Sequence, residues 1–199
     1  IYDHMKFEIP KSTQPTMEDI ENTYKKLEEE QYTHVIAVVI SSGLSGTYNA
    51  FQIVSEQFDS IETYICDTKS TSVCEGIILK KCGEFIEAGK NFASIVQAIP
   101  SMKRKLHFFF VFGTLEYARK GGRIGRISGT IGELLDIKPI VGFDEQYGQC
   151  FTNAKIRGKN RAIHKLVELG EEIVKGKKCD AYIVHGNVEE DAKKVYDML

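Results

Sequence analysis

The sequence predicts an α/β protein in two lobes, with a parallel sheet flanked by helices in the first lobe and a mixed α/β arrangement in the second. Two runs rich in Val and Ile, Val35–Ile40 and Ile61–Cys66, are typical of buried parallel strands. Helical patterns alternate with these strands, as in βαβ units. Two short apolar runs around residues 144–148 predict an antiparallel hairpin later in the chain. We therefore expect lobes at residues 1–105 and 106–199.

Apolar residues at the spacing of one helix face predict three helices in the first lobe. These are Met17–Glu30, a helix that starts at about Ser45 or Thr47 and carries Phe51, Val54 and Phe58 inward, and Gly76–Ala88. The second lobe is expected to contain strand Phe108–Phe112, paired strands Pro139–Phe143 and Gln149–Ala154, helix Asn160–Val174, strand Ala181–Val184 and a last helix with Ala192, Val195, Tyr196 and Leu199 on one face.

Composition and charge narrow the functional classes. The 199 residues are 42% hydrophobic and 27% charged, which is ordinary for a folded, water-soluble protein. A net charge of −2 argues against nucleic acid or an anionic membrane as the main partner. No apolar run approaches the roughly 20 residues of a membrane helix, and the first residues lack the pattern of a signal peptide. We therefore expect a cytoplasmic protein with no membrane insertion.

The cysteines are expected to be structural. There are five, an odd number, without CxxC spacing. Cys74 and Cys82 fall on a helical pattern, where a small buried thiol is common. Since metal-ligand spacing is also absent from the sequence, we expect neither a metal site nor a cofactor. The chain begins at Ile1 rather than Met, which suggests part of a longer protein.

The segment SSGLSGT, residues 41–47, is the sharpest local feature of the sequence. It leads from a predicted strand into a predicted helix, whose first N–H groups lack partners within the helix. The helix dipole adds partial positive charge there, so a carboxylate or phosphate is readily accepted. Its hydroxyl-bearing residues are Ser41, Ser42, Ser45 and Thr47. The alternative is that Ser45 or Thr47 only caps the helix.

The same segment also starts like a hydrolase motif. Gly43-Leu44-Ser45 matches the beginning of the nucleophile elbow G-x-S-x-G, but Thr47 stands where the motif requires glycine. The sequence does not single out a His or an Asp as a triad partner. A serine hydrolase is therefore the weaker interpretation.

The loop IPKSTQPT, residues 9–16, offers further hydroxyls at Ser12 and Thr13. Pro15 favours an extended backbone at Gln14, and Thr16 is placed to cap the helix that follows. A simple junction between loop and helix would explain the same pattern.

Two basic segments follow in the second half of the chain. KGGRIGR and KIRGKNR contain Arg119, Lys120, Arg123, Arg126, Lys155, Arg157, Lys159 and Arg161 in or beside them. The first lacks the GxxxxGK[ST] pattern of a P-loop. Arginine suits bidentate contacts with carboxylate or phosphate, although a solvated basic face is the common explanation for such charge runs.

Taken together and in this order, the motifs resemble those of the DegV family. KSTQP resembles the family's TSQP loop, and SSGLSGTY is close to its SSxLSGTY motif. EYARKGGRI with a downstream IKPI resembles the family's L-x-x-GGRI…KP segment, and KIRGKNRAI resembles its KxR-x-KKA junction. The resemblance covers essentially the whole chain and implies a two-lobed DegV-like fold that buries a fatty acyl chain between its lobes.

The resemblance also implies a function and a set of site residues. The fatty acid's carboxylate would be bound by Ser12, Thr13, Ser42, Ser45 and Thr47 and by backbone N–H groups near Gly46. Many bacterial members are the non-catalytic binding subunit of fatty acid kinase. They present the carboxylate to a separate ATP-using subunit, which makes acyl phosphate for phospholipid synthesis. Arg123 and Arg157 match arginines near the head group and the kinase-facing surface.

The chain departs from the family pattern in three places. Its first loop reads Ser12-Thr13 where the family usually has Thr-Ser. The family's first strand and a C-terminal segment with a His before a glycine-rich turn have no counterpart here. The alternative function is that of an enzyme or binding protein for a phosphorylated small metabolite, with phosphate held by the helix end at Ser45 and by Arg123.

Overall fold

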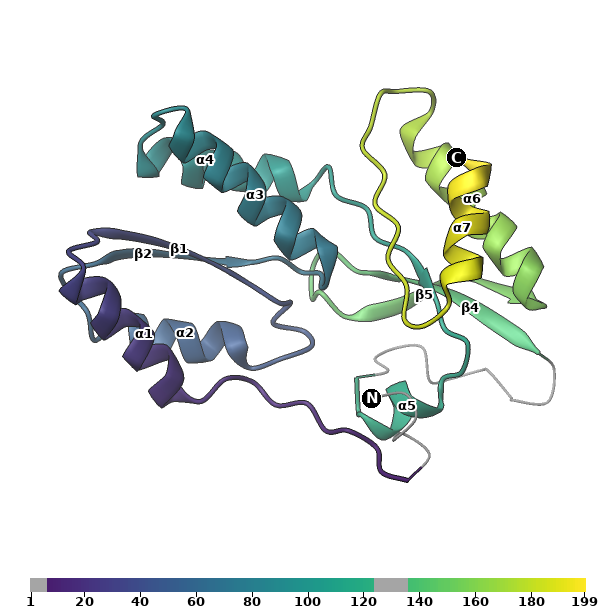
Figure 1. Cartoon of the computed structure of the whole chain (residues 1–199), viewed down its shortest axis with the longest axis horizontal. Coiled ribbons are helices and arrows are strands. Elements are labelled where there is room, and N and C mark those ends of the chain that lie inside the picture. The colour runs from purple at the N-terminus through teal and green to yellow at the C-terminus, as the bar shows by residue number, and fades with distance from the viewer. Residues whose placement is uncertain (1–6, 124–135) are drawn as a thin grey trace. The chain divides into compact units, whose positions relative to one another are not determined.

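The computed structural model of the chain describes residues 7–123 and 136–199, and these form two compact units. The parallel-sheet unit comprises residues 13–108 and 144–149. The antiparallel-sheet unit comprises the remaining described residues, 7–12, 109–123, 136–143 and 150–199. The α/β class and the separation into a parallel and an antiparallel sheet agree with the sequence (Figure 1). The lobe limits 1–105 and 106–199 stay a prediction.

Strands β1 (His34–Val39) and β2 (Glu62–Asp67) form the centre of the parallel-sheet unit. They pair in parallel, from His34 opposite Glu62 to Val39 opposite Asp67. Both lie within about a residue of the runs predicted from the sequence. Because the strands are parallel and in register, their carboxyl ends meet at one edge of the sheet.

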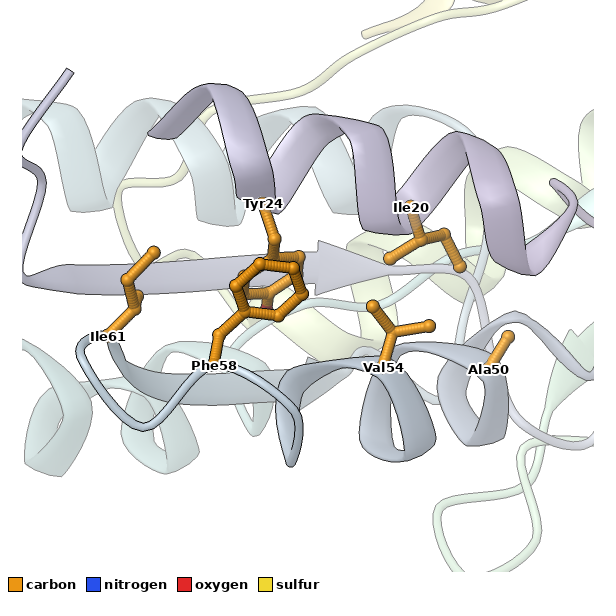
Figure 2. Packing of buried hydrophobic residues seen from close by; sticks show 6 residues of the cluster. All are labelled: Ile20, Tyr24, Ala50, Val54, Phe58 and Ile61. Carbon is orange, nitrogen blue, oxygen red and sulfur yellow. The ribbon is translucent and has the colours of Figure 1, made fainter. Parts of the chain in front are cut away.

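Helices α1 (Met17–Glu29) and α2 (Thr47–Ser55) cover one face of this sheet (Figure 1). Thr16 caps α1 in a capping box with Asp19, as its position before the helical pattern predicts. The buried cluster between the two helices contains Ile20, Tyr24, Ala50, Val54, Phe58 and Ile61 (Figure 2). The rings of Tyr24 and Phe58 stack with centroids 5.1 Å apart.

Helices α3 (Val73–Glu87) and α4 (Phe92–Lys103) cover the other face. Ile36 and Val38 of β1 pack on this side against a cluster of Cys66, Ile78, Cys82, Ile95 and Ile99, whereas Val35 packs on the α1 side. Helix α4 is missing from the sequence prediction. Pro100 lies in its last turns, where its missing N–H removes one helical hydrogen bond without ending the helix.

The antiparallel-sheet unit contains strands β3 (Phe110–Val111), β4 (Ile137–Phe143) and β5 (Cys150–Arg157), in the order β3-β4-β5. Strands β4 and β5 form the hairpin that the sequence predicts, with longer arms. Helix α6 (Lys159–Val174) packs on this sheet and α7 (Glu189–Met198) packs on α6. The short helix α5 (Glu116–Lys120) precedes the residues that are not described.

Some predictions for the second half of the chain are wrong or fall outside the described residues. Residues 181–184 form no strand, because no described strand lies beside them to share backbone hydrogen bonds, and Tyr182 and Val184 are exposed. On α7, Tyr196 and Leu199 are exposed rather than packed, since α6 covers only a narrow stripe of the helix. Residues 124–129 of the basic segment, with Arg126, lie outside the described residues.

We expect Tyr24 to be a principal determinant of stability. It is 1% exposed, stacks on Phe58, and donates a hydrogen bond of 3.2 Å from its hydroxyl to Thr63 Oγ1. Tyr24→Ala should lower the free energy of unfolding by about 3–5 kcal/mol, as for other buried aromatic truncations. Tyr24→Phe, which loses only the hydrogen bond, should cost about 0.5–1.5 kcal/mol.

Urea unfolding monitored by circular dichroism measures both effects. Tyr32→Ala is the control, because Tyr32 is 53% exposed and should change stability by less than about 0.5 kcal/mol. Equal losses for Tyr24→Ala and Tyr32→Ala would contradict the packing shown in Figure 2.

Candidate functional site

The SSGLSGT turn, residues 41–47, lies at the carboxyl edge of the parallel sheet, directly after β1. In open α/β sheets this edge is where ligands are usually bound. Asp67 ends β2 at the same edge, and the backbone N–H of Ser41 donates to Ser70 O at 2.9 Å. The turn therefore lies against the segment that follows the neighbouring strand.

Ser41 anchors one side of this turn. It is fully buried, and its Oγ donates a hydrogen bond of 2.7 Å to the carbonyl of Gly148, in the turn between β4 and β5. The two turns touch closely, since a Cβ at Gly43 would lie 2.3 Å from Tyr147 O. Gly148 has φ +64°, and a Cβ there would lie 2.0 Å from Ser41 Oγ. Only glycine fits at these two positions.

Ser42 anchors the other side. Its backbone N–H donates to Asp67 Oδ1 at 3.1 Å and its hydroxyl donates to Asp67 Oδ2 at 2.5 Å. The ammonium of Lys69 lies 2.8 Å from Asp67 Oδ2 and 2.9 Å from Ser42 Oγ. Because the only proton of the Ser42 hydroxyl points to Asp67, contact between Ser42 and a ligand stays a prediction.

Ser42 and Lys69 are close enough to suggest a Ser–Lys pair of the kind that some hydrolases use. A lysine that serves as a general base must have its amine free to accept a proton, whereas Lys69 forms an ion pair of 2.8 Å with the carboxylate of Asp67. Burial alone would raise the pKa of Asp67, but hydrogen bonds from Lys69 and Ser42 outweigh it and hold that pKa below its ordinary value. These contacts favour a structural role for the cluster over nucleophilic catalysis.

Ser45 and Thr47 form a pair of hydroxyls at the N-terminus of α2. Their oxygens are 2.8 Å apart, and Thr47 N–H donates to Ser45 Oγ at 3.3 Å. One of the two hydroxyl protons is used within the pair, which leaves the other to donate outward. The N-cap residue is Gly46, which has no side chain to bond the N–H groups of the first turn of α2. Hydroxyl, N–H groups and helix dipole at this point favour an anionic ligand.

Gln14, which follows the predicted hydroxyls of Ser12 and Thr13 in the chain, lies against this helix end. The Oε1 of Gln14 would be 2.0 Å from a Cβ at Gly46, so the Gln14 side chain lies directly on that glycine. Thr13, next to Gln14 in the chain, is exposed. Two hydroxyl-bearing segments about 30 residues apart in the sequence are thus neighbours.

The remaining predicted site residues belong to the antiparallel-sheet unit. Arg123 is exposed, and its guanidinium lies 3.5 Å from the carbonyl of Ser12. Arg157 is also exposed and lines an open hollow of about 580 Å³ beside the start of α6. The other residues around that hollow are Asp136, Gly158, Lys159, Asn160 and Arg161.

A second hollow, of about 780 Å³, lies at the amino ends of β1 and β2. Ile36, Leu79 and Phe92 are among the apolar side chains that line it. None of the predicted site residues borders this hollow, so it is separate from the site at the carboxyl edge.

Cys74 and Cys82 are buried, as their helical pattern predicts. Burial raises the pKa of both Cys66 and Cys150 to about 11, so these thiols stay protonated at neutral pH. Within residues 7–123 and 136–199, no group of three His, Cys, Asp or Glu side chains could hold a metal ion. No helix in those ranges combines the length and apolar character needed to cross a membrane.

A family model described as DegV matches residues 1–199. The chain belongs to the DegV family. A DegV domain-containing protein from Clostridium acetobutylicum is 45% identical over 199 residues, which are 100% of this chain and 71% of that protein.

Solved structures of DegV family proteins have the same fold. A fatty acid binding DegV family protein from Streptococcus agalactiae is 31% identical, with a TM-score of 0.91 over 99% of this chain and 70% of that one. DegV from Bacillus subtilis, described as a fatty acid binding protein, is 27% identical, with a TM-score of 0.87 over the same shares. The two-lobed DegV-like fold expected from the motifs is thereby confirmed.

The residues that hold the SSGLSGT turn in place were not identified from the sequence. Asp67 follows the predicted strand Ile61–Cys66 directly, and the carboxyl ends of parallel strands share an edge, so it could have been assigned to the site. Lys69, two residues after Asp67, could have been assigned to the same edge of the sheet. Gly148 carries no such signal, because its contact with Ser41 joins residues 107 positions apart.

The close approach of the two turns makes Gly43 intolerant of a side chain. Gly43→Ala should lower the free energy of unfolding by about 1–3 kcal/mol, the usual cost of overpacking, because the added Cβ meets backbone carbonyls that cannot rotate away.

Gly83→Ala is the matched control. A Cβ at Gly83, in the middle of α3, meets nothing within 4 Å. This change should stabilise the protein by about 0.5–1 kcal/mol, because alanine favours helix. Chemical unfolding of both variants decides the matter, and a Gly43→Ala protein as stable as the Gly83→Ala protein would refute the tight contact.

Proposed function

We propose that this chain binds one long-chain fatty acid through its carboxylate at the N-terminus of α2. The observation that carries the proposal is the Ser45–Thr47 hydroxyl pair at a helix end whose N-cap is a glycine, with Gln14 lying against that Gly46. Thr13 and Ser12 of the same loop complete the proposed set of donors, and Ser42, whose N–H and hydroxyl both donate to Asp67, would border the head group without donating to it. Solved DegV relatives described as fatty acid binding proteins support it.

The physical balance favours such a ligand. An alkyl chain gains roughly 0.8 kcal/mol for each CH₂ that leaves water, so a chain of ~16 carbons binds tightly once its head group is satisfied. Hydroxyl and N–H donors satisfy the carboxylate without the large desolvation cost of a buried cation. The site needs no catalytic group to do this.

We further propose that the chain is the non-catalytic binding subunit of a fatty acid kinase. A separate ATP-using subunit would phosphorylate the presented carboxylate for phospholipid synthesis. The exposed Arg123 and Arg157 suit this partner better than the lipid tail, because an arginine buried beside an alkyl chain is costly unless paired. Exposed, they can attract an acidic patch on the kinase and steady the negative charge of the transferred phosphate.

The first test of this function is ligand content and affinity. Native mass spectrometry of the purified protein should reveal a bound C14–C18 acid. Ser45→Ala should then weaken oleate binding by about 5- to 150-fold, equivalent to about 1–3 kcal/mol for a lost hydrogen bond to a charged group.

Ser94→Ala is the control for this test, because Ser94 is exposed on α4 and should leave oleate affinity unchanged. A copurified phosphorylated metabolite in place of a fatty acid would support the alternative function. Unchanged oleate affinity in Ser45→Ala would show that the carboxylate binds elsewhere.

The second test separates lipid binding from phosphorylation. The chain alone, incubated with ATP, magnesium and oleate, should form no acyl phosphate. With the kinase subunit added, Arg123→Glu and Arg157→Glu should each bind oleate normally but form acyl phosphate at least about tenfold more slowly, since charge reversal at an interface opposes association.

Lys26→Glu serves as the control charge reversal, because Lys26 is exposed on α1 and makes only a long ion pair of 3.9 Å with Glu30. It should leave the phosphorylation rate unchanged. Loss of oleate binding in the two arginine variants, with normal phosphorylation of the remaining complex, would refute this division of roles.

A further inference from the structure

Asp67 is the most fully occupied carboxylate near the hydroxyl turn. Its Oδ1 accepts from the backbone N–H groups of Ser42 and Lys69, at 3.1 and 3.0 Å. Its Oδ2 accepts from the Ser42 hydroxyl at 2.5 Å and from the Lys69 ammonium at 2.8 Å. Its side chain is 13% exposed. Four donors at this distance hold the carboxylate, and through it the turn, in one orientation.

Such a carboxylate is unexpected beside a site for an anion. Ser45 N–H donates to Ser41 O at 3.1 Å, so the backbone from Ser41 to Ser45 forms a single tight turn. Asp67 bonds Ser42 within this turn and is therefore close to Ser45. An isolated negative charge there would repel the carboxylate of a fatty acid. Lys69 stands against Asp67 with its side chain 27% exposed, and the pair is neutral overall.

The backbone shows that Lys69 is held in this place. Its φ is +52°, in the left-handed region that few residues other than glycine adopt. Its Cα and Cδ pack against Gly148, where an added Cβ would lie 3.0 and 2.9 Å from them.

We propose that Asp67 and Lys69 are positioning residues for the carboxylate site, in which Asp67 fixes the turn through Ser42 and Lys69 cancels the charge of Asp67 that would repel the ligand. The inference rests on the proposed fatty acid function. Neither residue touches the ligand. The Ser42 proton is turned inward to Asp67, and the Ser45–Thr47 pair is left to meet the head group.

The test compares a charged and an uncharged head group on the same alkyl chain. Lys69→Met keeps the length of the side chain and removes its charge. It should weaken binding of oleate by roughly tenfold, the effect of one uncompensated nearby charge. Binding of oleyl alcohol should change by less than about twofold, since an alcohol is not repelled by a carboxylate.

A second variant keeps the test sharp if Lys69→Met also disturbs the turn. In Lys69→Met/Asp67→Asn the unpaired charge is gone, while the amide oxygen can still accept from the backbone N–H groups of residues 42 and 69, so oleate affinity should recover to within about threefold of the parent protein. Lys25→Met is the control, because Lys25 forms an exposed ion pair of 2.6 Å with Glu21 on α1 and should leave both affinities unchanged.

The outcomes distinguish the inference from the function on which it rests. Equal losses for oleate and oleyl alcohol, with no recovery in the double variant, would overturn the charge-cancelling role while leaving fatty acid binding in place. A parent protein that binds neither ligand would overturn the proposed function, and this inference with it. Selective loss of oleate binding and its recovery would establish the pair as a determinant of head-group charge.

Discussion

The parallel pairing of β1 with β2 is the constraint on which the described site depends. Because Val39 and Asp67 are register partners, whatever follows β1 must lie beside the end of β2. Two apolar clusters, one on each face, pack the two strands between α1 and α2 on one side and α3 and α4 on the other. At the carboxyl edge of this sheet, backbone N–H and C=O groups no longer have partners in a neighbouring strand. Polar side chains form hydrogen bonds with them instead.

The hydroxyls of the SSGLSGT turn have different hydrogen-bond partners, according to their positions in the turn. Ser41 and Ser42 donate inward, to Gly148 O and to Asp67, and so are consumed in holding the turn. Ser45 and Thr47 bond mainly to each other and stand at the start of α2. Residues of the same chemical type thus perform different tasks, and the inward hydrogen bonds of Ser41 and Ser42 restrain the turn.

The sequence allowed the fold class and most elements to be predicted, because hydrophobic periodicity reports burial directly. It failed where neighbours decide the structure. Residues 181–184 have an apolar run but pair with none of the strands in the described part of the chain. Helix α4 contains Pro100, a residue that usually argues against a helix. The sequence singled out the hydroxyls of the SSGLSGT turn as site candidates, yet Gly148, which accepts from Ser41, belongs to a hairpin whose contact no local pattern reveals.

The hydrogen bond from Ser41 to Gly148 also bears on how the protein is made. A ribosome delivers Ser41 long before Gly148, since the two are 107 residues apart. While the intervening chain emerges, the Ser41 hydroxyl cannot be buried against its final acceptor, and an unsatisfied buried hydroxyl costs about 1–3 kcal/mol. The SSGLSGT turn therefore reaches its final hydrogen bonding only after Gly148, in the turn between β4 and β5, has been made. A nascent chain stalled before Gly148 would lack the acceptor that the Ser41 hydroxyl has in the folded protein.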